Sequence, residues 1–108
     1  MLSNRLELLK QFLEEDPNDP FNHYALATEY LKTEPSKAKE IYEYLLKNHA
    51  EYLPTYYHAG ALLVEFEEYD SAQKVYLEGI ELAKKAGNER ALKELKGAYQ
   101  MLLDELEM

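Results

Sequence analysis

Apolar side chains recur along this chain at steps of three and four residues, and no stretch alternates at every second position. Such spacing lines up apolar side chains on one face of an α-helix. The pattern predicts six helices and no strand, over residues 4–15, 20–32, 37–48, 51–67, 71–86 and 89–107. In the first helix, the side chains predicted to face inward are Leu6, Leu9, Phe12 and Leu13.

Turn and capping residues mark most of the predicted helix ends. Two prolines within residues 16–20 break the chain, because each proline pushes its predecessor out of the helical region. Ser36 is predicted to cap the third helix, while Gly87 and Asn88 are predicted to stop the fifth helix and cap the sixth. The break near residues 68–70 contains neither glycine nor proline, and its position depends partly on an internal repeat.

One pattern of residues occurs twice, 34 positions apart. Ala38 and Tyr42 return as Ala72 and Tyr76, with three residues between the members of each pair. Upstream of each pair, small and large residues have matching spacing, in His23-x2-Leu26-Ala27-x2-Tyr30 and Tyr56-x2-Ala59-Gly60-x2-Leu63. Both copies resemble the tetratricopeptide repeat, whose pattern is W-x2-L-G-x2-Y, then A-x3-F, then P. The final proline of that pattern is absent from both copies.

The resemblance implies an all-α fold, in which antiparallel helix hairpins stack in a right-handed superhelix. It implies one domain over residues 1–108, made of a leading helix or half-repeat (1–19), a first repeat (20–52), a second repeat (53–86) and a C-terminal capping helix (87–108). Small residues such as Gly60 would let the two helices of a hairpin approach closely. A helical bundle without repeats would show the same periodicity and is the alternative fold.

In this family the first helix of each repeat lines a concave groove, so the resemblance also implies a partner-binding surface. The positions that would face the groove are Phe21, Tyr24, Thr28, Leu31, Pro54, Tyr57, Ala61, Val64 and Glu65. Tyrosine provides a large contact area for little loss of conformational entropy, which suits recognition of a peptide or helix. The alternative is that the terminal helix fills the groove.

Charge limits the partners that the chain is expected to bind. The 108 residues include 12 Lys and Arg against 21 Asp and Glu, which gives a formal net charge of −9. Nucleic acids and anionic membrane surfaces would repel such a chain, whereas a basic or neutral protein would complement it. The alternative is that the acidic excess serves solubility alone.

The sequence shows no arrangement that is typical of a catalytic, cofactor or metal site. It has no cysteine, and its histidines, His23, His49 and His58, lack the spacing of a zinc motif. The acidic cluster at residues 65–70 lacks the alternating carboxylates and the glycine of a calcium loop. We therefore expect neither enzyme activity nor a cofactor.

Two functional hypotheses follow from these observations. The first is a non-catalytic module that binds a peptide or helix of another protein, and the second is a scaffold unit that oligomerises through exposed repeat ends. The first ten residues lack the apolar core of a signal peptide, and the longest apolar stretch, residues 59–64, is far shorter than a membrane span. A cytoplasmic location is therefore expected.

Overall fold

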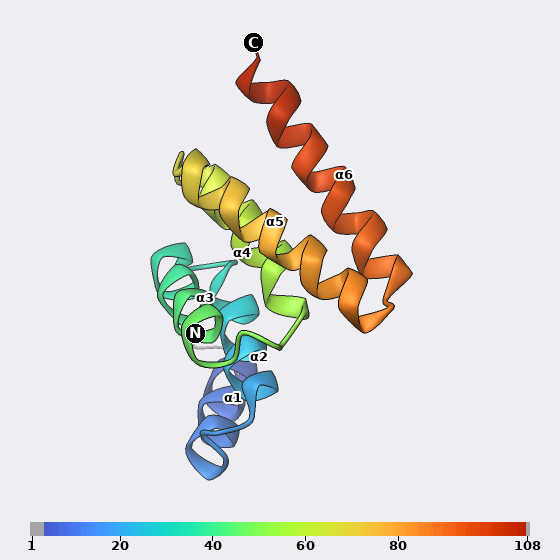
Figure 1. Ribbon diagram of the computed structural model, residues 1–108. Helices are drawn as coiled ribbons and strands as arrows, with labels where there is room; N and C mark the ends of the chain where they lie inside the picture. Colours follow the sequence, from blue (N-terminus) through green and yellow to red (C-terminus); the bar gives the residue numbers. More distant parts are fainter. Residues whose placement is uncertain (1–3, 108) are drawn as a thin grey trace. The chain divides into compact units, whose positions relative to one another are not determined.

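The computed structural model describes residues 4–107, which form six α-helices and no strand (Figure 1). The helices are α1 (Asn4–Glu15), α2 (Pro20–Tyr30), α3 (Pro35–Asn48), α4 (Pro54–Glu65), α5 (Tyr69–Ala86) and α6 (Glu89–Leu106). The prediction of an all-α fold with six helices is confirmed. Residues 1–3 of the predicted leading segment and residue 108 of the predicted capping segment lie outside the described residues.

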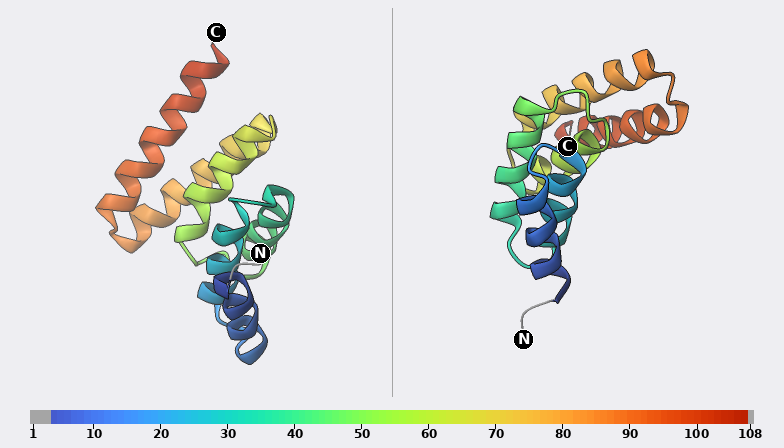
Figure 2. Two further views of the ribbon diagram at one scale, coloured as in Figure 1. Left: turned by 180° about the vertical axis from the view of Figure 1, so that it is seen from behind. Right: turned by 90° about the horizontal axis from the view of Figure 1, so that it is seen from below.

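The chain divides into two compact units, which are unit 1 (Met1–Tyr52) and unit 2 (Leu53–Met108). In unit 1, α2 packs on both α1 and α3. In unit 2, α5 packs on both α4 and α6, and α4 also contacts α6. Short connections join α4 to α5 and α5 to α6, so that α4 and α6 run in the same direction along α5 (Figure 2).

Local chemistry explains where several helices begin. Three helices, α2, α3 and α4, begin with a proline, at a position where an amide hydrogen would have no partner within the helix. Asp19 caps α2, because its side chain accepts a hydrogen bond of 3.0 Å from the backbone amide of Phe21. The cap predicted at Ser36 is wrong, since Pro35 has a backbone angle suited to the first turn and already belongs to α3.

The ends of α4 and α5 share one backbone arrangement. Gly87 has a φ of 67°, as predicted for the stop of α5, and the Asn88 side chain caps α6 by accepting a 3.0 Å hydrogen bond from a backbone amide of its first turn. At the end of α4, Glu67 adopts a φ of 60° although it is not glycine. The amide of Glu68 then donates to the carbonyl of Leu63 at 2.9 Å, which satisfies a carbonyl of the last turn. This break therefore needs no glycine or proline.

Each unit buries its own set of apolar side chains. In unit 1 the buried residues are Leu9, Leu26, Ala27, Tyr30, Ala38, Tyr42 and Leu45. In unit 2 they are Tyr56, Ala59, Leu62, Leu63, Ala72, Val75, Tyr76, Ile80, Ala83, Leu95 and Leu102. Phe12 is 42% exposed, so its predicted inward position is wrong. The reason is that α1 packs mainly on α2, which covers only the side of α1 that carries Leu9.

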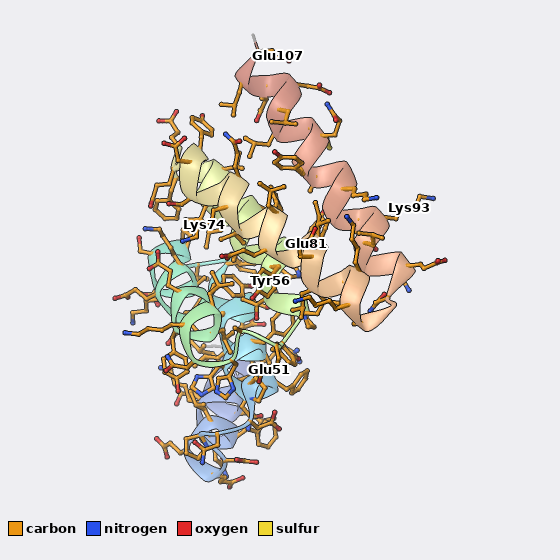
Figure 3. The ribbon with its side chains drawn as sticks, viewed as in Figure 1. Glu51, Tyr56, Lys74, Glu81, Lys93 and Glu107 are labelled. Atoms are coloured by element: carbon orange, nitrogen blue, oxygen red, sulfur yellow. The ribbon has the colours of Figure 1, made fainter. Side chains whose placement is uncertain are left out.

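The α4–α5 hairpin is closely packed around two glycines. A Cβ atom added to Gly60 would lie less than 3.0 Å from three atoms of the Tyr76 ring. A Cβ atom added to Gly79 would lie 2.7 Å from the Cβ of Tyr56, which is labelled in Figure 3. Each helix of the hairpin thus carries a glycine that accommodates a tyrosine of the other helix. The close approach predicted at Gly60 is observed.

Candidate partner-binding cleft

Unit 2 contains an open cleft of about 500 Å³ between α4 and α6, which we call the α4–α6 cleft. Its lining is mostly apolar and consists of Tyr57, Ala61, Val64, Tyr76, Ala98, Met101, Leu102, Asp104 and Glu105. Tyr76 and Leu102 are buried, whereas Tyr57 is 43% exposed and Met101 is 72% exposed. Large apolar side chains that remain in contact with water around an apolar cleft are typical of a binding surface.

The two walls of the α4–α6 cleft are helix faces with the same spacing. On α4, steps of four and three residues connect Tyr57, Ala61 and Val64. On α6, steps of three or four residues connect Ala98, Met101, Leu102 and Glu105. Side chains at these steps lie above one another on one face of a helix. Each wall includes an alanine, whose small side chain leaves room between the larger ones.

Three of the predicted groove residues of unit 2 line the cleft, and two do not. It brings Tyr57, Ala61 and Val64 together in the α4–α6 cleft. Pro54 and Glu65 are exposed at the two ends of α4 and do not line the cleft. Within unit 2, α6 contacts α4 but leaves this cleft open, so α6 does not fill the exposed face of α4.

The α6 wall of the cleft was not predicted. The sequence predicts that residues 87–108 cap the repeats or, as the alternative, that this terminal helix fills the groove, but it does not predict a helix face that lines an open cleft. The signal that could have revealed the wall is a second stripe, Ala98, Met101 and Glu105, beside the buried Leu95 and Leu102. A methionine on an exposed helix face suits binding, because its flexible side chain adapts to different surfaces.

Negative charge collects at the end of the cleft where α4 and α6 terminate. Asp104 and Glu105 line the cleft near the end of α6, and Glu65 is the last residue of α4. Neither helix has a basic residue in its last turn. The aligned peptide dipoles of each helix add a partial negative charge at its C-terminal end. This end of the cleft is therefore suited to a cationic group.

Burial favours the neutral forms of two titratable groups at the cleft, Tyr76 and His58. Burial raises the pKa of the Tyr76 phenol to about 12, and the nearby Tyr57 contributes a smaller increase. Burial lowers the pKa of His58, whose ring packs edge-on against Tyr57 at a centroid distance of 5.7 Å. Among the lining residues, Asp104 and Glu105 are the acidic ones, and none is basic.

The predicted groove residues of unit 1 contribute more to packing. The Tyr24 ring lies with its centroid 6.4 Å from that of Tyr42 and 5.7 Å from that of Tyr52. The Thr28 hydroxyl donates to the Tyr24 carbonyl at 2.9 Å and lies 3.0 Å from the Tyr42 hydroxyl. Burial raises the pKa of Tyr24, and raises that of Tyr42 to about 12. Phe21 is exposed on α2, and Leu31, which directly follows α2, is half-buried.

The two histidines of unit 1, His23 and His49, pack against other side chains of that unit. The His23 ring stacks on Tyr44 at a centroid distance of 4.7 Å, and its Nε2 lies 2.7 Å from the Pro17 carbonyl oxygen. The His49 ring lies 6.0 Å from His23, and its Nδ1 lies 3.9 Å from a carboxylate oxygen of Glu51. Within residues 4–107, no three His, Asp or Glu side chains gather in a way that could hold a metal ion.

Comparison with solved structures identifies close similarities in fold. The solution structure of a tetratricopeptide repeat domain protein from Salinibacter ruber is 40% identical, with a TM-score of 0.75 over 81% of this chain and 89% of that one. The crystal structure of the tetratricopeptide repeat domain protein from the same organism is 38% identical, with a TM-score of 0.77 over 81% and 98% of the two chains.

A more distant similarity extends over most of the chain. The crystal structure of MamA protein is 23% identical, with a TM-score of 0.66 over 94% of this chain and 58% of that one. At this level of identity the similarity concerns the fold alone. No family model and no curated protein sequence matches the chain.

Proposed function

The chain belongs to the tetratricopeptide repeat family, and we propose that it is a non-catalytic module that binds a peptide or helix of another protein. The observation that carries this proposal is the α4–α6 cleft, with its apolar lining and its exposed Tyr57 and Met101. A tyrosine anchor beside an adaptable methionine offers both a rigid and a deformable contact. The proposed ligand needs no cofactor and undergoes no reaction.

We further propose that residues 20–52 and 53–86 are the two repeats, with a leading helix over 1–19 and a capping helix over 87–108. The helix pairs α2–α3 and α4–α5 support this division, because each forms one packed hairpin. The border between the two compact units, after Tyr52, coincides with the proposed start of the second repeat.

The net charge and the helices of the chain suggest the kind of partner and the location. A net charge of −9 supports a basic or neutral protein partner over nucleic acid or an anionic membrane surface. None of the helices within residues 4–107 is long and apolar enough to cross a membrane. We propose a cytoplasmic location, where such a protein partner would be available.

Affinity capture with the intact chain as bait, compared with a Tyr57→Ala variant, tests the proposed function. A cleft of this size suits a transient interface that buries no more than about 1,200 Å² and has a Kd near the micromolar range. Loss of a central tyrosine anchor should weaken such a complex by about 1–2 kcal/mol, or roughly tenfold. Tyr57 is a cleaner target than Tyr24, because Tyr24 packs against two other tyrosines.

Leu77→Ala provides the matched control. Leu77 is 45% exposed on α5, similar to the 43% of Tyr57, but it does not line the cleft. A partner that binds the cleft should be retained by Leu77→Ala and largely lost by Tyr57→Ala. Equal retention of the partner by both variants, with unchanged helicity, would contradict the proposed function.

Self-assembly is the second candidate function. The observation that favours it is the exposed apolar pair on α1, where Leu8 is 47% and Phe12 is 42% exposed. These side chains lie four residues apart on the helix that opens the array and could pack against another copy. Light scattering at several protein concentrations tests this candidate, which a persistent monomer would exclude.

A further inference from the structure

The spacing of the lining residues on the two walls of the α4–α6 cleft favours a helical ligand. Tyr57 to Val64 and Ala98 to Glu105 each cover seven residue steps, which corresponds to about 10 Å or two helical turns. A third helix that lies between two such walls would present apolar side chains at the same steps of three and four residues. The ligand therefore needs only about two turns of amphipathic helix to fill the apolar part of the cleft.

Charge distinguishes the two ends of the cleft. Asp104, Glu105 and Glu65 lie where α6 and α4 end, whereas the basic residues of α6, Arg90, Lys93 and Lys96, precede the cleft-lining segment. Figure 3 shows Lys93 on α6, pointing away from α5. The first part of α6 also carries Glu89 and Glu94, so three basic and two acidic residues give residues 89–96 a formal charge of +1, whereas Asp104 and Glu105 give residues 97–106 a charge of −2. The helix dipoles of α4 and α6 add to the negative charge at this second end.

We propose that the α4–α6 cleft binds one amphipathic helix of a partner protein, antiparallel to α4 and α6, with basic residues at the N-terminal end of that helix. In this orientation the ligand's lysine or arginine side chains face Asp104, Glu105 and Glu65. The positive end of the ligand's own helix dipole meets the negative ends of α4 and α6. This inference rests on the proposed function and adds the charge and the direction of the ligand.

Two synthetic peptides of identical composition test the orientation, with the intact chain as receptor. Each is a capped helix with leucines at steps of three and four residues; one carries three lysines in its first turn and a half, and the other carries them in its last. We expect the peptide with N-terminal lysines to bind about fivefold tighter at low ionic strength. Added salt should reduce this preference, because the charges are exposed to solvent.

Paired substitutions connect the preference to the cleft. The double variant Asp104→Asn, Glu105→Gln should bring the two affinities to within about twofold of each other. The control Glu78→Gln, Glu81→Gln removes the same charge from α5, outside the cleft lining (Glu81 is labelled in Figure 3), and should keep the preference. Binding should also shift the NMR signal of the Met101 methyl group, which reports contact with the cleft.

The outcomes separate this inference from the proposed function. Equal affinities, or tighter binding of the peptide with C-terminal lysines, overturn the orientation, while loss of both peptides on Tyr57→Ala would leave the proposed function standing. Two results would overturn both the orientation and the proposed function. One is binding that Tyr57→Ala does not weaken and that leaves the Met101 signal unchanged, and the other is no binding of either peptide. Sedimentation of the chain alone, if it shows association that Tyr57→Ala abolishes, identifies a second copy as the ligand and overturns the inference.

Discussion

Gly60 is the position where a single methyl group should disturb the fold most directly. A Cβ atom there would overlap the buried ring of Tyr76, so Gly60→Ala should lower the free energy of unfolding by about 1–3 kcal/mol, and Gly60→Leu by more. Gly97→Ala is the control, because a Cβ atom at Gly97 on α6 meets nothing within 4 Å. That change should stabilise the chain by about 0.5–1 kcal/mol. Urea unfolding measures the free energy of unfolding of both variants. An unchanged value for Gly60→Ala would contradict the close packing.

Thr55 carries a buried hydroxyl that we expect to lower stability. Its side chain is 0% exposed, and its Oγ1 has no hydrogen-bond partner among the described residues. Thr55→Val replaces the hydroxyl with a methyl group of similar size, and should raise the free energy of unfolding by about 1 kcal/mol. Thr28→Val is the matched control, because the Thr28 hydroxyl is hydrogen-bonded. It should destabilise by about 1 kcal/mol, and a change of the same sign in both variants would refute this account.

The end of α4 contains a strained residue that glycine would relieve. Glu67 has a φ of 60°, in the left-handed region that costs a residue with a side chain about 1–2 kcal/mol. Glu67→Gly removes this strain but increases the freedom of the unfolded chain, so a net gain of up to about 1 kcal/mol is expected. Gly87→Ala makes the reverse change at the end of α5, where φ is 67°, and should destabilise by about 1 kcal/mol. Thermal melts of the two variants should shift in opposite directions.

The neighbouring helices explain why the predicted groove faces of α2 and α4 differ. The stripe on α4 becomes a cleft wall because α6 runs beside it in the same direction, which brings Glu65 and Asp104 to the same end. On α2, Tyr24 and Thr28 instead contact Tyr42 of α3. The residues predicted to face the groove thus form an open apolar surface in unit 2, whereas in unit 1 they form a largely structural cluster.

Both units of the molecule should lose stability at alkaline pH. Tyr42 in unit 1 and Tyr76 in unit 2 have pKa values of about 12 in the folded chain, against about 10 in the unfolded chain. Above pH 10 the unfolded state therefore releases these protons first, and folding becomes less favourable as the pH rises toward 12. Each tyrosine should reduce the free energy of unfolding by about 1 kcal/mol at pH 11.

Unfolding measured at pH 8 and pH 11 tests this expectation. Tyr76→Phe keeps the ring that fills the space beside Gly60 but removes the ionisable group. Its stability should fall less between the two pH values than that of the parent chain. Parallel losses in the parent and the variant would show that the Tyr76 phenol is not the group responsible.

The helices could be predicted because their signals lie close together in the sequence. The steps of three and four residues predict all six helices, with bounds that differ from the observed ones by up to three residues, as at the start of α4 (51 predicted, 54 observed). The stop at Gly87 and the cap at Asn88 depend on neighbouring residues and agree with the observed elements. The internal repeat added the close approach at Gly60, since a spacing that occurs twice constrains which faces can meet. The residue that ends α4 could not be predicted, because Glu67 adopts a left-handed conformation that sequence preferences assign to glycine.

The exposure of each apolar stripe could not be predicted, because burial depends on which helix lies beside it. Phe12 and Leu9 belong to the same apolar face in the sequence, yet only Leu9 is covered. Tyr24 and Tyr57 occupy equivalent positions in the two copies of the sequence pattern, but Tyr24 packs within unit 1 while Tyr57 remains exposed beside α6. Sequence alone thus established the family pattern and the helices. Contacts between helices distant in sequence established the cleft, because they determine which side chains lose their contact with water.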